Sequence, residues 1–364
     1  RDLLRPLVNS DPFMQRLNDN DPYLLHGPML SNVTDSRAEF WIRTYREQPV
    51  SVVLKPIGKE EALKSETVET KASLDYTARI SVDGLEANTE YHYNLIVGDR
   101  EIGNKSTDRR WVFRTYPENG ESAKVSVGFG GGAGYTPYYN HMWNTLSSRW
   151  LPAFLFLGDN VYIDHPNYPA VQDYCYYRRQ SSPEYQNFVS RTSIYAIWDD
   201  HDMATNDSWG TPAKDQPDWK IPVWKKYKDN WNNPYYGGGE ENPGVWTDFS
   251  IGDIDFFMLD GRYYRTSPAL ENTDMLGEAQ KEWLFEQLKQ SDATFKVIAS
   301  PVPWSFGVKR GTQTVYGPLG TVKPSEDTEG VEVPRVNDTW EGYAEEREKI
   351  FSFIEENKIE GVIL

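Results

Sequence analysis

Six short apolar runs in the last two thirds of the chain restrict its fold more than any other feature of the sequence. They read KVSVGFGG (124–131), PAFLFLGDN (152–160), SIYAIWDDHD (193–202), IDFFMLDGRYYR (254–265), FKVIASPVPW (295–304) and IEGVIL (359–364). Unbroken runs of four to six apolar residues are typical of strands that are covered on both faces. The segments NHMWNTLSSRWL, EAQKEWLFEQLKQS and EGYAEEREKIFSFIEENK between them can form helices, and the second is amphipathic. The alternation predicts a layered α/β core.

The preceding part of the chain has a different pattern. Residues 31–116 contain short alternating runs separated by polar turns, which predicts an all-β region. The segment GLEANTEYHYNLIV has the spacing of a sandwich corner in which a tyrosine anchors the turn. We therefore expect an immunoglobulin- or fibronectin-like sandwich. With the polar linker 117–124 as a boundary, the expected organisation is an N-terminal extension (1–30), a β-sandwich domain (31–120) and an α/β domain (121–364).

Polar residues follow several of the apolar runs directly. Asp159 and Tyr162 follow the second run, Asp200 and His201 the third, and Arg262 the fourth. In open α/β sheets, ligands bind beyond the carboxyl ends of the strands. Any one of these residues could be a helix cap, a turn former or a structural histidine. Together they predict several oxygen donors and an imidazole at one edge of the sheet.

Closely spaced carboxylates need a cation or a shared proton to coexist. A ligand set rich in carboxylates suits Ca²⁺, Mg²⁺, Mn²⁺ or iron, and Fe³⁺ accepts a phenolate well. The single cysteine, Cys175, excludes internal disulfides and cysteine-based zinc sites. The formal net charge of −17 makes nucleic acid and anionic lipid improbable partners. No apolar run approaches the roughly 20 residues of a transmembrane helix.

Five motifs in this order resemble the alkaline phosphatase D (PhoD-like) family of the calcineurin-like metallophosphoesterase superfamily. They are GDNVYID (158–164), IWDDHDMATND (197–207), FFMLDGRYYR (256–265), LGEAQKEWLFEQLKQSDATFKVIASPVPW (276–304) and DTWEGYAEER (338–347). The β-rich region resembles the family's N-terminal domain. The resemblance implies a four-layer α/β/β/α catalytic domain that hydrolyses phosphate mono- or diesters with a metal-activated hydroxide.

The resemblance also implies roles for individual residues. Asp159 would bridge two metals, Tyr162 would bind a ferric ion as phenolate, and Asp200 and Asn206 would be further metal ligands. The implied metals are Fe³⁺ with Ca²⁺, with Mn²⁺ or Mg²⁺ as alternatives. His201 would contact the phosphate and assist the leaving group.

Arg262 has two interpretations in this framework. It would either face the phosphate oxygens or form a structural ion pair with Asp260 or another acid.

The sequence departs from the family pattern in two places. The family's Ser-Cys pair, whose cysteine binds iron, corresponds to Gly131 and Gly132. The chain stops at EGVIL, before the family's SGD-x-H segment with its further metal-binding histidine. We therefore expect the catalytic domain of this chain to be incomplete at its C-terminus, and its metal content to differ from the family pattern.

The leading functional prediction is a secreted or periplasmic metal-dependent phosphatase or phosphodiesterase whose substrate is a small phosphoester. The first residues lack a signal-peptide core, so the prediction of secretion rests on the resemblance to the family. A purple-acid-phosphatase-like enzyme also combines a β-sandwich with GD-x-x-Y, but DDHD and LDGRYYR argue against it. A catalytically silent binding protein that retains the fold is the third hypothesis. The long segments 211–250 and 305–339 are predicted loops near a site, and the tryptophans around the first could stack on a substrate or simply pack on the core.

Overall fold

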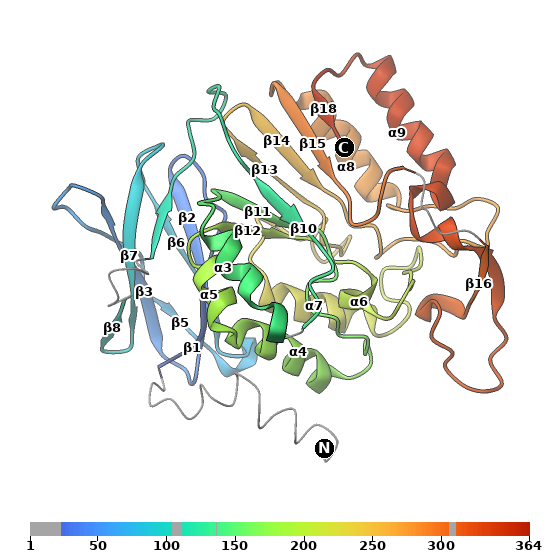
Figure 1. The fold of residues 1–364 in the computed structure, drawn as a ribbon, viewed down its shortest axis with the longest axis horizontal. Coiled ribbons are helices and arrows are strands. Elements are labelled where there is room, and N and C mark those ends of the chain that lie inside the picture. Colours follow the sequence, from blue (N-terminus) through green and yellow to red (C-terminus); the bar gives the residue numbers. More distant parts are fainter. Residues whose placement is uncertain (1–22, 104–110, 136, 306–310) are drawn as a thin grey trace.

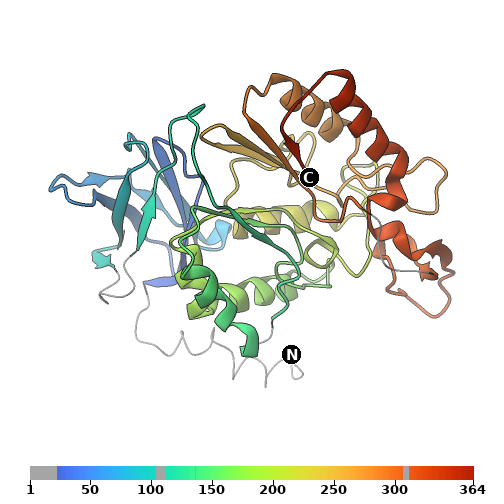
Figure 2. The ribbon, with the colours of Figure 1, turned by 45° about the horizontal axis from the view of Figure 1, so that its top comes forward.

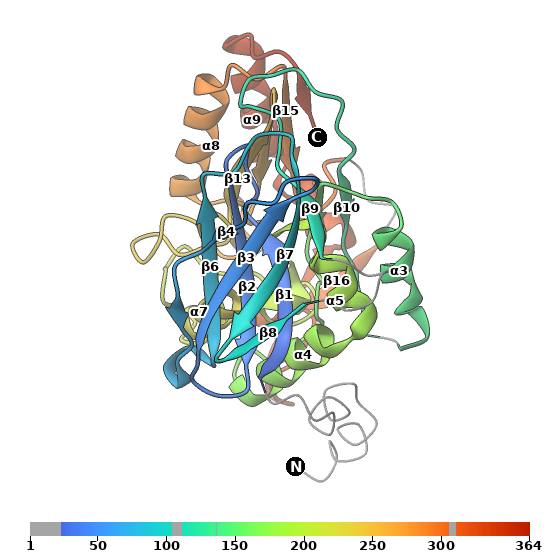
Figure 3. The ribbon, with the colours of Figure 1, turned by 90° about the vertical axis from the view of Figure 1, so that its left-hand side faces the viewer.

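A computed structural model describes residues 23–103, 111–135, 137–305 and 311–364 (Figure 1). Most of the expected N-terminal extension, residues 1–22, lies outside the described residues. The following residues form two antiparallel sheets, whose faces are turned toward the viewer in Figure 3. One sheet contains β1 (Leu24–Ser31), β2 (Arg37–Thr44) and β6 (Thr77–Asp83). The other contains β3 (Pro49–Pro56), β4 (Leu63–Lys64), β5 (Val68–Glu69), β7 (Glu90–Val97), β8 (Arg100–Ile102) and β9 (Val112–Arg114).

Strand β1 begins seven residues before the expected start of the sandwich, within the segment that the sequence assigned to the extension. It was missed because LLHGPMLS does not alternate and contains Pro28, which is unusual inside a strand. The pairing with β2 shifts register around His26 and Met29, which accommodates the Gly-Pro step. The predicted corner tyrosine is Tyr91, whose hydroxyl accepts a hydrogen bond from the Glu86 backbone N–H at 2.8 Å.

All six apolar runs of the second half contain strands. A parallel sheet contains β10 (Gly128–Gly130), β11 (Ala153–Phe156) and β12 (Ser193–Ala196). A second sheet has the order β13 (Thr247–Ile251), β14 (Ile254–Met258), β15 (Phe295–Ala299) and β18 (Val362–Ile363), and only β13 is antiparallel to its neighbour. The helices are α3 (His141–Ser147), α4 (Pro169–Ser181), α5 (Pro183–Val189), α6 (Asp200–Met203), α7 (Lys220–Asn230), α8 (Glu278–Gln290) and α9 (Ala344–Glu356).

Helices cover the two sheets on opposite sides, as Figures 1 and 2 show. Trp143 of α3 and Phe188 of α5 stack at 5.8 Å between centroids beside the first sheet. On the other side, Leu284 of α8 and Ile350 of α9 belong to one buried cluster with Ile298 of β15. The strands are therefore covered on both faces, as their continuous apolar sequence requires.

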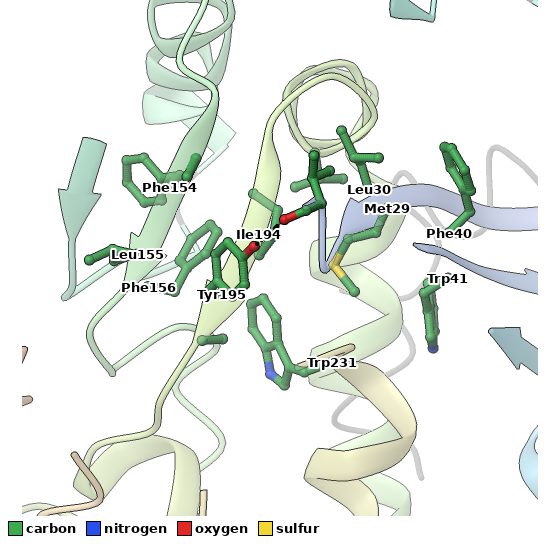
Figure 4. Close-up of a cluster of buried hydrophobic side chains, with 14 of the residues drawn as sticks. Met29, Leu30, Phe40, Trp41, Phe154, Leu155, Phe156, Ile194, Tyr195 and Trp231 are labelled. Atoms are coloured by element: carbon green, nitrogen blue, oxygen red, sulfur yellow. Dashed lines mark hydrogen bonds between the residues drawn. The ribbon is translucent and has the colours of Figure 1, made fainter. Parts of the chain in front are cut away.

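The N-terminal sheets pack tightly on the α/β half. Figure 4 shows Met29 and Leu30 of β1 close to Ile194 and Tyr195 of β12. The Tyr195 hydroxyl donates a hydrogen bond to the Val33 carbonyl at 3.3 Å. The two halves thus share one hydrophobic core.

The two predicted long loops have structure of their own. The first contains α7, and the tryptophans in and around it are all buried, which supports packing on the core: Trp209, Trp219, Trp224, Trp231 and Trp246. The second contains the hairpin of β16 (Thr312–Val315) and β17 (Val331–Pro334), followed by the 3-10 helices η4 (Arg335–Asp338) and η5 (Trp340–Tyr343). Across the described parts of the chain, no helix has the length and apolar character that crossing a membrane demands.

Candidate metal centre

The carboxyl ends of β11 and β12 approach each other closely, and a glycine makes this possible. Gly158, just after β11, has a φ of 112°, and a Cβ at this position would lie 2.4 Å from the Asp199 Cβ. Such a contact is far inside van der Waals distance, so any other residue would push the two strand ends apart. The glycine therefore allows Asp159 and Asp200, the next residue on each segment, to face each other.

Three of the predicted residues meet at this point. Asp159, Asp200 and His201 each offer a ligand atom, and these atoms all lie within 4.8 Å of one another. The Asp159 Oδ1 atom is buried and has no hydrogen-bond partner among the described residues. Burial and the neighbouring Asp200 raise the pKa of Asp159 to about 6. An unpartnered buried carboxylate oxygen beside a second carboxylate is the environment that a bound cation relieves, so these residues fit a metal.

Tyr162 completes one side of this group. Its ring lies 4.5 Å from the His201 ring, measured between centroids. Burial and the charge of Asp159 raise the pKa of the phenol. The glycine-rich turn after β10 passes beside this ring, because a Cβ on Gly132 would lie 3.8 Å from the Tyr162 hydroxyl. Gly132, which has no side chain, therefore faces Tyr162, the predicted metal ligand.

The segment that carries these ligands is conformationally strained. Asp159, Tyr162 and Asp164 have positive φ angles of 52°, 46° and 58°. Residues with a Cβ rarely adopt this region, and each instance costs on the order of 1–3 kcal/mol. Backbone hydrogen bonds from Ile163 and Asp164 to the His201 carbonyl, at 2.8 and 3.3 Å, hold the segment in place. Such strain clusters at functional sites.

Asp202 attaches the same segment to the end of β12. Its fully buried carboxylate accepts backbone hydrogen bonds from Asn160 at 2.8 Å and Val161 at 3.0 Å. It also accepts one from the Asp199 backbone at 3.1 Å. Asp202, the third aspartate of the DDHD motif, thus holds the two strand ends together, and this structural role was not predicted.

His201 is oriented by a carboxylate that the sequence interpretation overlooked. The His201 Nδ1 atom lies 2.5 Å from Asp164 Oδ1. Burial lowers the pKa of His201, but the hydrogen bond to Asp164 and the charges of Asp200 and Asp159 outweigh it and raise the pKa to about 9. Because Nδ1 is engaged, Nε2 is the nitrogen available to the site. Asp164 lies inside the GDNVYID motif, so its presence next to Tyr162 was the available signal.

Arg262 does not face the site as a free phosphate-binding group. Its side chain is 0% exposed and forms ion pairs with Asp199 and, at 2.7 Å, with Asp338. Its Nη1 donates to the Ser208 carbonyl at 2.9 Å. Burial opposes its charge, but the carboxylates outweigh burial and raise the pKa of the guanidinium.

Of the two interpretations of Arg262, the structure therefore contains the structural ion pair. Asp260, the partner considered from sequence, instead accepts hydrogen bonds from Trp198 Nε1 and the Val245 backbone.

Asn206 is not brought into the cluster. It is exposed, and its Nδ2 donates to Thr321 Oγ1 at 2.9 Å. The next residue, Asp207, turns inward and forms a second acidic group with Asp200 and Asp338, again with ligand atoms within 4.8 Å. Asp207 also accepts a hydrogen bond from Gln313 of β16 at 2.6 Å. Asp207 belongs to the segment MATND and Asp338 to the motif DTWEGYAEER, but the sequence pattern did not show that these two residues meet.

Comparisons with known proteins identify the family and the fold. The chain is 23% identical over 350 residues to alkaline phosphatase D of Bacillus subtilis (strain 168), which covers 82% of this chain and 54% of that protein. It thus spans about half the length of this relative. A solved structure described as the structure of PhoD matches 94% of this chain and 71% of its own, with a TM-score of 0.73 and 18% identity, so the fold is shared. Residues 21–113 match a domain of unknown function, DUF7800. Residues 127–364, well over half of the chain, match the model of the PhoD-like phosphatases, and the chain therefore belongs to the PhoD-like phosphatase family.

Proposed function

We propose that this protein is a metal-dependent phosphoric ester hydrolase that acts on small phosphate mono- or diesters. The observation that carries the proposal is the group formed by Asp159, Asp200 and His201 at the ends of two parallel strands. Membership of the PhoD-like phosphatase family supports the same chemistry.

In this proposal Asp159, Asp200 and Tyr162 hold the metal, with Fe³⁺ and Ca²⁺ as the preferred ions and Mn²⁺ or Mg²⁺ as alternatives. Bound cations would polarise the phosphoryl oxygens and supply a nucleophilic water near neutral pH. Asn206, whose amide is turned toward Thr321, has no ligand role in this proposal. Arg262 positions Asp199 and Asp338 and does not bind the phosphate.

His201 acts on the leaving group. Its Nδ1 is held by Asp164, so Nε2 can present a proton to the ester oxygen that departs. As the P–O bond breaks, the electron pair remains on that oxygen, which takes the proton and leaves as an alcohol. Asp164 fixes the orientation of the ring and stabilises its positive charge, so that it acts as a positioning residue.

A second hypothesis is a silent binding protein that retains the fold. Gly132 favours it, because the turn beside Tyr162 contributes no side chain to the metal centre. Such a protein would bind metal at this site more weakly, or would bind a different metal.

The arrangement of the layers and domains of the protein forms part of the same proposal. The helices on both sides of the two sheets support a four-layer α/β/β/α domain over 121–364. The paired antiparallel sheets and the Tyr91 corner support an immunoglobulin-like domain, with 31–120 extended at its start by β1. We further propose that the protein is secreted or periplasmic.

Metal analysis and hydrolysis assays on the full-length protein test the proposal. We expect stoichiometric metal and hydrolysis of p-nitrophenyl phosphate or bis(p-nitrophenyl) phosphate. Chelation and Asp159→Asn should abolish both. Asp173→Asn is a matched control, since this aspartate lies on α4 and pairs with Lys226 at 2.6 Å. Absence of bound metal together with absence of hydrolysis would overturn the enzymatic proposal in favour of the silent protein.

A further inference from the structure

One arginine of α4, a helix that contacts the Tyr162 backbone through Cys175, has no anionic partner. Among the described residues Arg178 forms no ion pair and no hydrogen bond, and its Nε atom is buried without a partner. Arg191 also has a buried Nε atom without a partner, but it precedes β12. Arg178 as a whole residue is only partly buried. An arginine fork without a partner readily binds a carboxylate or phosphate.

Arg178 lies close to two segments that contact Tyr162. Cys175, one helical turn earlier on the same face, has its Sγ 3.9 Å from the Tyr162 carbonyl. On the other side, the Arg178 guanidinium lies 4.1 Å above the ring of Tyr135. Tyr135 directly follows Gly134, where a Cβ would lie 3.9 Å from the Tyr162 ring. Two segments that border Tyr162 thus both lead to Arg178.

Aromatic stacking gives the guanidinium a defined orientation. It lies over Tyr135 and, at 5.4 Å, near Tyr174 of the same helix. Stacking on rings leaves the edge of the guanidinium, with its N–H donors, free for a planar oxyanion. The neighbouring Arg179 is buried and donates to the Ala133 carbonyl, so it adds positive charge but no competing acid.

We propose that Arg178 is a specificity-determining residue that binds a second anionic group, a carboxylate or a phosphate, on the leaving group of the substrate. This inference rests on the proposed function and narrows its substrate class to phosphoesters with two anionic ends. A purely structural role at the C-terminal turn of α4 is the competing explanation.

Three esters test the proposal on the metal-loaded full-length protein. They are 4-carboxyphenyl phosphate, hydroquinone bisphosphate and 4-carbamoylphenyl phosphate, and the last is the neutral analogue of the first. We expect the wild type to prefer at least one of the two esters with a second anionic group over the carbamoyl ester through a lower KM. Arg178→Gln should remove this preference, with a loss of about tenfold in kcat/KM for that ester only. Arg178→Lys should retain part of it, and the responsive ester identifies the preferred anion.

Arg191→Gln is a matched control. Arg191 also stacks on an aromatic ring, that of Trp150 at 4.2 Å, but it precedes β12 and so lies at the opposite edge of the sheet. The Arg191→Gln variant should have the wild-type kcat/KM for all three esters. Equal kcat/KM for all esters in the wild type, or an equal loss for all of them in Arg178→Gln, would overturn the inference and leave the proposed function intact. If no ester is hydrolysed, the proposed function fails and this inference fails with it.

Discussion

Replacing Arg262 by methionine distinguishes most sharply between a structural and a substrate-binding role for this residue. The side chain is completely buried, and it compensates the buried carboxylate of Asp199 and the largely buried carboxylate of Asp338. Methionine has a similar volume but no charge, so Asp199 would lose its counterion, whereas Asp338 would keep only its ion pair with Arg265 at 3.1 Å. Removing one partner of a buried ion pair typically costs about 3–5 kcal/mol. We expect Arg262→Met to lose about this free energy of unfolding.

Urea denaturation followed by tryptophan fluorescence measures the loss. Arg114→Met is the control, because Arg114 pairs with Glu90 at 3.0 Å while both side chains are largely exposed. Exposed pairs contribute less than about 1 kcal/mol, so this variant should unfold close to the wild type. Adding Asp199→Asn to Arg262→Met should restore part of the lost stability, since it removes the carboxylate that is left without a counterion.

The opposite pattern would refute the reasoning. If the free energy of unfolding of Arg262→Met lies within about 1 kcal/mol of the wild-type value while KM for a phosphoester rises strongly, Arg262 contacts substrate in solution. The ion pairs seen here would then not describe its working state.

Three further predictions address other parts of the molecule. Asp164→Asn should lower kcat by about 10²–10⁴-fold with little change in metal content, because the amide no longer holds His201 in the required tautomer; steady-state kinetics and metal analysis measure this. Gly132→Cys should destabilise the protein by about 1 kcal/mol through its φ of 68°, and its thiol beside Tyr162 should change the amount or identity of bound metal. The buried carboxyl Glu346 has a pKa raised by burial from 4.5 to about 7, so the folded state binds more protons than the unfolded state between these pH values. Stability should therefore fall as pH rises from 5 to 8, by about 2 kcal/mol, and Glu346→Gln should remove this fall in urea titrations.

Each of these predictions has a clear contrary result. Unchanged kcat in Asp164→Asn would mean that this carboxylate does not orient the imidazole. Unchanged metal binding in Gly132→Cys would mean that the turn does not face the centre. A pH-independent stability difference between Glu346→Gln and the wild type would mean that this carboxyl titrates normally in the folded protein.

Much of the fold and the place of the site could be predicted from local sequence. A continuous apolar run such as AFLF is stable only as a strand covered on both faces, so the layered α/β half follows from hydrophobic patterning alone. The polar residues after β11 and β12 had to meet, because the carboxyl ends of adjacent parallel strands lie at one edge. Asp159, Tyr162, Asp200 and His201 could therefore be predicted to lie at one edge of the sheet without any contact information. Strand β1 escaped because its buried, proline-containing sequence does not alternate.

The partners of individual charged groups were decided only by tertiary structure. Arg262 binds Asp199 and Asp338, which come from segments 63 and 76 residues away, and no local pattern selects them over Asp260. Between Asn206 and Asp207 a single step along the backbone turns one side chain to solvent and the next toward Asp200. Local sequence determines which residues form strands and where those strands end, because propensity and burial act over a few residues. The direction of each polar side chain beyond a strand end depends on backbone torsions and on distant segments, which only the packed chain brings together.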